Sequence, residues 1–250
     1  MTEIDLSGRT AVITGGAAGI GAACARALAG VGAEVTIADR DADGAAALAA
    51  ELGGRSWPID LLDTGALENL ELDCDILINN AGIQTVAAIQ DFEPAAYRRI
   101  MTLMLEAPFL LIRAALPRMY AAGWGRVINI SSVHGLRASP YKSAYVAAKH
   151  GLEGLSKVTA LEGGPHGVTS NCINPGYVRT ALVEGQIADQ AKTHGIAEDE
   201  VVERVLLAHA SIKKLVEPDD VGSLAQWLCS DAAGMVTGAS YTMDGGWSCA

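Results

Sequence analysis

Residues 10–21 read TAVITGGAAGIG, and this stretch decides the fold. Its start, 11–13, is a short apolar run typical of a buried parallel strand. Gly15, Gly19 and Gly21 follow and lead into an alanine-rich segment that predicts a helix. Glycines permit a tight turn and let backbone N–H groups approach a pyrophosphate at the helix N-terminus. Because a strand precedes the turn and a helix follows it, the context is that of a dinucleotide site, which an ordinary glycine-rich loop lacks.

The next predicted strand, 33–38, ends at Asp39. A carboxylate at this point can accept hydrogen bonds from the hydroxyls of the adenosine ribose, and it repels a 2′-phosphate. The sequence therefore predicts NAD as the cofactor, in preference to NADP. In the alternative interpretation, Asp39 and Arg40 only begin a loop, and Arg40 can contact a phosphate.

Two further strand ends are expected at the same edge of the sheet. The run 56–60 ends at an acid that can meet the adenine amino group, and 76–82 reads ILINNAG, whose polar end can form the floor of a cofactor cleft. The alternation of short strands with helices predicts a parallel sheet with right-handed crossovers. The residues assigned to the cofactor from these two segments are Asp60, Leu61, Asn80, Ala81 and Gly82, with Ile20 from the glycine turn.

A second motif pairs a tyrosine with a lysine. Lys149 follows Tyr145 by four residues, so a helix over 144–162 places both on one face. A nearby positive charge favours the phenolate, which lowers a pKa that is otherwise about 10. Tyr145 then becomes a usable general base, and Ser132 can hold a substrate oxygen. The alternative is an ordinary amphipathic helix with a packed tyrosine and a solvated lysine.

The composition limits the class of protein. A chain of 250 residues, half of them hydrophobic, suits one α/β domain spanning 1–250. A net charge of −11 argues against nucleic acid or an anionic membrane as a partner. The start, MTEIDLSGR, lacks the features of a signal peptide, and we expect no apolar run of transmembrane length. Five scattered cysteines predict reduced thiols in the cytoplasm, with no metal site.

Together, TGGAAGIG, NNAG, Ser132, YVAAK and NPGYVRT (174–180) resemble the short-chain dehydrogenase/reductase family, in the family's order and over nearly the whole chain. The resemblance implies a single doubly wound, Rossmann-type α/β domain with a parallel seven-stranded sheet, nicotinamide-dependent carbonyl–alcohol chemistry and a homotetramer. It implies that Tyr145 is the base, that Lys149 activates it and binds ribose, and that Ser132 binds the substrate oxygen. It also adds cofactor contacts at Pro175, Gly176, Val178 and Thr180.

Within the family, GWGRVINISSVHGLRAS, YVAAKHG and DGGW resemble the D-3-hydroxybutyrate dehydrogenases. In that branch two glutamines, a histidine and a lysine hold the substrate carboxylate. The matching positions here are Gln84, His134, Lys142 and Gln186. A short hydroxy acid offers little surface, so its carboxylate needs charged or amide donors for orientation. Each of the four residues, taken singly, can also be an ordinary surface or loop residue.

Several positions depart from the family pattern or stand outside it. Met104 occupies the place of a catalytic asparagine that, in the family, helps hold a water linking the active-site lysine to solvent, and a thioether donates no hydrogen bond. Tyr177 stands where 3-hydroxybutyrate dehydrogenases commonly carry tryptophan. The segment 181–217 has a helical pattern and can close over the substrate. Trp247 lies in a region that contacts a neighbouring subunit in the family, so it is expected at an interface or near another subunit's pocket.

These observations predict an NAD-dependent dehydrogenase of small 3-hydroxy acids, with (R)-3-hydroxybutyrate as the expected substrate. One alternative is a related dehydrogenase of another polar alcohol or a sugar. Another, of a different class, is a catalytically impaired NAD-binding sensor or scaffold protein. Met104 is the feature that favours the sensor, whereas the presence of Ser132, Tyr145 and Lys149 opposes it.

Overall fold

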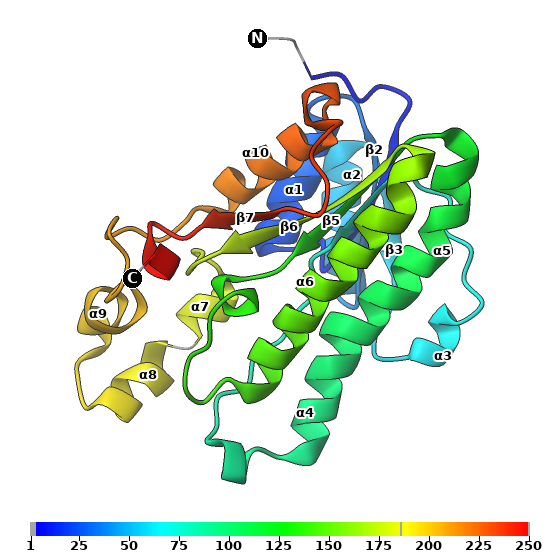
Figure 1. The fold of residues 1–250 in the computed structure, drawn as a ribbon. Helices are drawn as coiled ribbons and strands as arrows, with labels where there is room; N and C mark the ends of the chain where they lie inside the picture. The colour runs from blue at the N-terminus through cyan, green and yellow to red at the C-terminus, as the bar shows by residue number, and fades with distance from the viewer. Residues whose placement is uncertain (1–3, 186, 250) are drawn as a thin grey trace.

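Seven parallel strands form one sheet at the centre of the protein (Figure 1) in the computed structural model, which describes residues 4–185 and 187–249. In chain order they are β1 (Thr10–Thr14), β2 (Glu34–Asp39), β3 (Arg55–Pro58), β4 (Ile76–Asn79), β5 (Gly125–Ile130), β6 (Val168–Pro175) and β7 (Ser240–Met243). Their order across the sheet is β3-β2-β1-β4-β5-β6-β7. The predicted doubly wound fold is confirmed. The strand order reverses between β1 and β4, which is where such sheets bind ligands.

Helices cover both faces of the sheet (Figure 1). One face carries α1 (Gly19–Ala29), α2 (Ala42–Leu52) and α10 (Pro218–Cys229). The other carries α3 (Thr64–Leu67), α4 (Pro94–Met101), the π-helical turn η2 (Thr102–Glu106), α5 (Ala107–Ala122) and α6 (Ser143–Gly163). Between β6 and α10 lie α7 (Ala181–Glu184), α8 (Ile187–His194), α9 (Glu198–Val201) and the π-helical turn η5 (Val202–Leu206). Short 3-10 turns are η1 (Ile89–Asp91), η3 (Val133–Gly135), η4 (Gly164–His166), η6 (Asp231–Ala233) and η7 (Trp247–Cys249).

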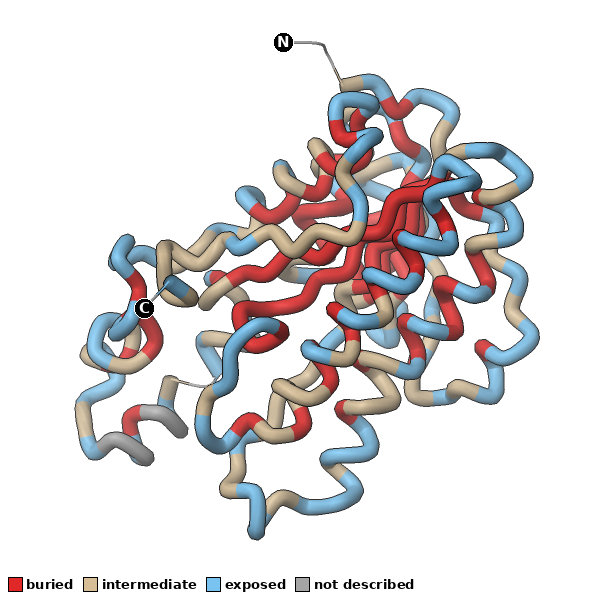
Figure 2. Tube along the Cα trace, in the orientation of Figure 1, coloured by how far each residue is buried: buried red, intermediate tan, exposed pale blue. Residues whose placement is uncertain are grey.

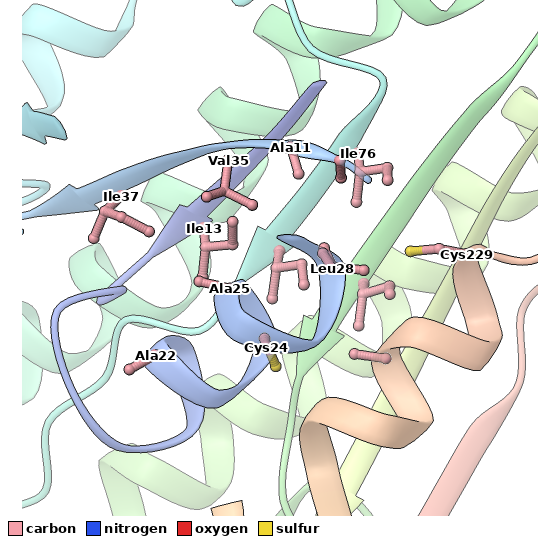
Figure 3. Close-up of a cluster of buried hydrophobic side chains, with 14 of the residues drawn as sticks. Ala11, Ile13, Ala22, Cys24, Ala25, Leu28, Val35, Ile37, Ile76 and Cys229 are labelled. Atoms are coloured by element: carbon pink, nitrogen blue, oxygen red, sulfur yellow. The ribbon is translucent and has the colours of Figure 1, made fainter. Parts of the chain in front are cut away.

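The core divides into two layers because successive side chains of a strand point to opposite faces. Ala11 and Ile13 of β1 join the layer beneath α1 and α10, whereas Val12 joins the layer beneath α5. Figure 2 shows that the central strands are buried while the outer helix faces are exposed. Figure 3 shows Cys24 and Leu28 of α1 packed between the sheet and α10. Both faces of the sheet are thus covered, as a parallel sheet requires.

The continuous helix Pro94–Ala122 differs from expectation. Its mean hydropathy of 1.6 over 18 residues makes it long and apolar enough to cross a membrane, although the sequence analysis expects no such run. The apolar stretch is easily overlooked in the sequence because Glu106 and Arg113 interrupt it. Leu111 and Met119 are fully buried against the sheet, which accounts for the apolar composition of this helix.

The glycine turn after β1 leaves no room for side chains. Gly15 and Gly19 have φ angles of 59° and 54°, which favour glycine. A Cβ on Gly21 would overlap the carbonyl oxygen of Gly15, and it would lie 2.7 Å from the Asn80 side-chain nitrogen. The start of α1 therefore packs directly against the turn and the end of β4.

We expect Gly21→Ala to destabilise the protein by about 1–3 kcal/mol, because the new methyl group must displace the turn. Gly65→Ala, exposed in α3, is the matched control, since a Cβ there meets only an ordinary contact at 3.5 Å with Asp63. That change should be neutral or stabilising by up to about 1 kcal/mol. Urea denaturation of both variants measures the difference, and equal stability of Gly21→Ala and wild type would contradict the packing argument.

Candidate active site

A cavity of about 380 Å³ opens at the carboxyl ends of the strands, next to the reversal point of the sheet. Nearly all residues that the sequence assigns to the cofactor line it. They are Gly15, Gly19, Ile20, Asp39, Asp60, Leu61, Asn80, Ala81, Gly82, Tyr145, Lys149, Pro175, Gly176, Val178 and Thr180. Gly21 is the exception, because it lies beneath the turn against Gly15 and Asn80.

The turn at one end of the cavity is held by Asn80. Its side-chain Nδ2 donates to the carbonyls of Thr14 and Gly15, each at 2.9 Å. Ala18 caps α1 without a side-chain hydrogen bond, so the first-turn amides of this helix have no side-chain acceptor. Close backbone packing and uncapped amides fit the pyrophosphate of a dinucleotide cofactor.

Asp39 is fixed at the edge of the cavity. One carboxylate oxygen accepts from the backbone N–H of Ala17 at 3.0 Å, and the other from that of Asp41 at 3.0 Å. Arg40 also lines the cavity, so the positive charge considered in the sequence analysis stands beside the acid.

Ser132, Tyr145 and Lys149 meet at the opposite end of the cavity. Ser132 follows β5, while Tyr145 and Lys149 lie one turn apart on α6, as their spacing predicts. The Lys149 ammonium is buried and donates to the carbonyl of Ile130 at 2.6 Å. It lies 5.7 Å from the centroid of the Tyr145 ring.

The electrostatics of this group differ from the expectation of an acidified phenol. Burial raises the pKa of Tyr145 above its ordinary value, and a hydrogen bond with Ser132 opposes the rise. Burial also lowers the pKa of Lys149 to about 8, which still leaves the ammonium charged at neutral pH. The prediction of a lowered tyrosine pKa was wrong for this arrangement, because desolvation outweighs the hydrogen bond.

A buried polar network behind Ser132 was not predicted. Asn174 donates from Nδ2 to the Ser132 carbonyl at 2.9 Å and to Glu153 at 2.5 Å. The second oxygen of Glu153 accepts from Ser240 at 2.6 Å. Glu153 follows Lys149 by one helical turn, and its charge partly opposes the fall in the lysine pKa. An acid on the apolar face of the predicted helix was the signal that the sequence offered.

Of the predicted carboxylate residues, His134 and Lys142 interact electrostatically with each other, and neither lines the cavity. Nδ1 of His134 lies 3.4 Å from the Ser132 hydroxyl, and burial, with Lys142 next, lowers the pKa of His134 to about 3. Burial lowers the pKa of Lys142 to about 8. Gln84 keeps its Nε2 buried without a hydrogen-bond partner among the described residues. Gln186 lies outside the described residues, so its placement stays a prediction.

Three other positions singled out from the sequence border this region. Met104 is buried in η2, lines the cavity, and belongs to an apolar cluster that packs against Tyr145. Tyr177 accepts a hydrogen bond from Lys142 at 3.3 Å. Trp247 packs on His134 of its own chain, with ring centroids 5.6 Å apart, so the residue approaches the pocket of its own subunit.

A separate apolar cluster forms within the segment predicted to cover the substrate. Ala191, Val201 and Leu206 are its buried members, and Tyr177 packs against them. The segment is helical, as expected, and one end is anchored by the bridge between Val178 and Val216. Its role as a cover stays a prediction.

The fold and this arrangement define a nicotinamide-dependent dehydrogenase acting on CH–OH groups. The family profile described as enoyl-(acyl carrier protein) reductase matches residues 15–248. The chain belongs to the short-chain dehydrogenase/reductase family.

Similar proteins support this assignment. The D-beta-hydroxybutyrate dehydrogenase of Rhizobium meliloti is 45% identical over 96% of this chain and 98% of its own length. That of Cupriavidus necator is 44% identical over 97% and 98%. A crystal structure from Agrobacterium tumefaciens, provisionally named a 2-deoxy-D-gluconate 3-dehydrogenase and holding NADP, is 33% identical, with a TM-score of 0.87 over the full length of both chains.

Tyr145→Phe should remove nearly all turnover while leaving NADH binding largely intact, because it deletes one hydroxyl at the reacting centre and little else. Steady-state kinetics measure the first effect, and titration of NADH fluorescence measures the second. Activity within about tenfold of wild type, or about 1.4 kcal/mol of barrier, would mean that the base is misassigned.

Proposed function

We propose that the protein oxidises (R)-3-hydroxybutyrate, or a similar small 3-hydroxy acid, to the 3-keto acid with NAD, reversibly. The observation that carries this proposal is the buried ammonium of Lys142, which makes no ion pair with a carboxylate of the described residues and lies in the same region as His134 and Ser132. A buried charge is costly unless paired, so an anionic substrate supplies what the pocket lacks. The similarity to D-beta-hydroxybutyrate dehydrogenases supports the same substrate class.

We call Gln84, His134, Lys142 and Gln186 the acid pocket, because these residues are proposed to hold the carboxylate of the substrate. With the carboxylate held there, the 3-hydroxyl lies against Ser132 and Tyr145. His134 is neutral near pH 7 because burial lowers its pKa to about 3, so it brings no charge to the pocket. Its Nε2 lies 2.9 Å from the Ser139 hydroxyl, which fixes the ring beside Ser132.

The chemical step needs removal of one proton and one hydride. The NAD⁺ that the cavity residues would hold would supply the hydride acceptor. Ser132 donates a hydrogen bond to the substrate oxygen, and the Tyr145 oxygen takes the proton of the hydroxyl. This transfer requires Tyr145 to be a phenolate, which becomes a neutral phenol when it takes the proton. The Lys149 ammonium, held at the cavity by Ile130, stabilises that phenolate before the transfer and binds the ribose. Electrostatic stabilisation of developing charge is strongest in such a buried setting.

We also propose that the protein is a homotetramer. Phe109 of α5 and Val158 and Leu161 of α6 are exposed apolar residues, with Leu161 at 79% exposure. Phe109 lines a groove with Met101, Leu105 and Leu155, and Leu155 belongs to the same helix as Val158 and Leu161. Exposed apolar surface of this kind is typical of an interface. Sedimentation velocity should give four times the mass of the chain, and a monomer would contradict the proposal.

The function is tested by NADH formation from the two enantiomers of 3-hydroxybutyrate. The (R)-enantiomer should react at least about tenfold faster in kcat/KM than the (S)-enantiomer, because a carboxylate fixed in the acid pocket presents only one face of the carbinol carbon to the cofactor. A neutral secondary alcohol of similar size should be a poorer substrate. Turnover of neutral alcohols or sugars alone would replace this function with the related polyol dehydrogenase.

Cofactor choice rests on Asp39, whose carboxylate is fixed at the cavity edge by Ala17 and Asp41. We expect NAD⁺ to be preferred over NADP⁺ in kcat/KM, and Asp39→Ala to narrow the preference by about tenfold, by relieving the repulsion of a 2′-phosphate. Asp43→Ala, an exposed acid in the first turn of α2, is the matched control. Comparable use of both cofactors by wild type would overturn the NAD assignment.

Substitution of Met104 tests whether proton transfer between the active site and solvent needs an asparagine at this position. If proton transfer proceeds without one, Met104→Asn should change kcat by less than about tenfold, or 1.4 kcal/mol of barrier. The variant should also lose stability, because Met104 is buried and an amide there lacks an evident partner. Kinetics in H₂O and D₂O, with a melting curve, measure both effects. A much larger gain in kcat, with a falling solvent isotope effect, would show that Met104 limits the relay.

A further inference from the structure

The acid pocket contains a phenol beside its buried ammonium. Lys142 is 6% exposed, and its Nζ lies 3.3 Å from the Tyr177 hydroxyl and 5.1 Å from the centroid of that ring. The pair stands on two different elements, since Lys142 precedes α6 and Tyr177 follows β6. A phenol oxygen can accept from the ammonium and still donate its own hydrogen to another group.

The Tyr177 hydroxyl is available as a donor. Burial raises its pKa to about 12, and the charge of Tyr145 adds to the rise, so the hydroxyl keeps its proton at neutral pH. An anionic oxygen in this region therefore meets two donors, one charged and one neutral.

The backbone and the ring of Tyr177 are held in place. Its carbonyl accepts from the N–H of Val216 at 2.9 Å, next to the bridge between Val178 and Val216. Its ring packs against the apolar cluster of Ala191, Val201 and Leu206. The hydroxyl is thus directed at Lys142 by a rigid support, and little conformational entropy is lost when it binds a ligand.

We propose that Tyr177 is a specificity-determining residue whose hydroxyl binds the substrate carboxylate together with Lys142. This inference rests on the proposed function, because it assigns a further ligand to the same acid pocket. A carboxylate has lone pairs for several donors, and Lys142 and Tyr177 supply two from two separate segments. An indole at this position, as in the resembling branch of the family, cannot accept a hydrogen bond from the lysine.

Tyr177→Phe is the test, because it removes one oxygen and keeps the ring against Val201 and Leu206. KM for (R)-3-hydroxybutyrate should rise about tenfold or more with kcat within about threefold, since loss of a ligand to a charged group mainly weakens binding. Tyr120→Phe, at the far end of α5 against His166, is the matched control and should change neither constant. A melting curve shows whether Tyr177→Phe keeps the fold, and Tyr177→Trp, whose indole N–H can still donate, should have a lower KM than Tyr177→Phe.

Acetate separates this inference from the proposed function. Calorimetric titration of acetate into the enzyme–NAD⁺ complex reports the anion site without turnover, and Tyr177→Phe should weaken it about tenfold. If wild type oxidises 3-hydroxybutyrate but Tyr177→Phe leaves both KM and acetate affinity unchanged, the function stands and the inference fails. If wild type does not oxidise 3-hydroxybutyrate, the function fails, and the acetate titration alone decides the role of Tyr177: weaker binding by the variant supports it, and equal binding overturns it.

Discussion

The 2.6 Å hydrogen bond from the buried ammonium of Lys149 to the carbonyl of Ile130 is the interaction on which the site depends. It joins α6 to the last residue of β5, so Tyr145, one turn earlier, is fixed relative to Ser132. A buried ammonium costs free energy unless other groups compensate it. Here the carbonyl supplies a contact, and the charge of Glu153 acts from the next turn of the same helix. Glu153 is itself held by Asn174 and Ser240, so β6 and β7 share in positioning the lysine.

The sheet explains why cofactor and chemistry share one edge. All seven strands are parallel, so their carboxyl ends lie together, and the reversal of strand order between β1 and β4 separates the loops that follow them. The turn after β1 packs against Asn80 at the end of β4, and Ser132 follows β5, the next strand in the sheet. Because β6 is the next strand after β5 in the sheet, the segment that follows β6 lies beside the segment that follows β5, and Tyr177 contacts Lys142 there. Neighbouring strands thus carry first the glycine turn, then Ser132, then Tyr177.

The sequence was sufficient where a feature is local. The strand predicted at 11–13, the glycine turn and the spacing of Tyr145 and Lys149 depend on neighbouring residues. The structure has all three, with β1 one residue longer at each end. Features that join distant segments were not predictable: Asn174 meets Glu153 across 21 residues, and Ser240 meets it across 87. The direction of the Tyr145 pKa was wrong for the same reason, because helical spacing places a lysine beside a phenol but does not show how much both are desolvated. Likewise, no local pattern indicated that a π-helical turn surrounds Met104.

The two buried lysines link the stability of the fold to ligand binding. Burial lowers the pKa of Lys142 and of Lys149 to about 8, from the 10.5 of a free lysine. Between these values the unfolded chain binds more protons than the folded one, so these two groups destabilise the fold most below about pH 8, and the penalty is relieved as pH rises from 8 to 10.5. An anion bound at Lys142 reduces the destabilisation that this buried lysine causes at neutral pH, because an opposite charge favours the ammonium. A carboxylate substrate of the kind proposed would therefore stabilise the fold, and a neutral alcohol would not provide that gain.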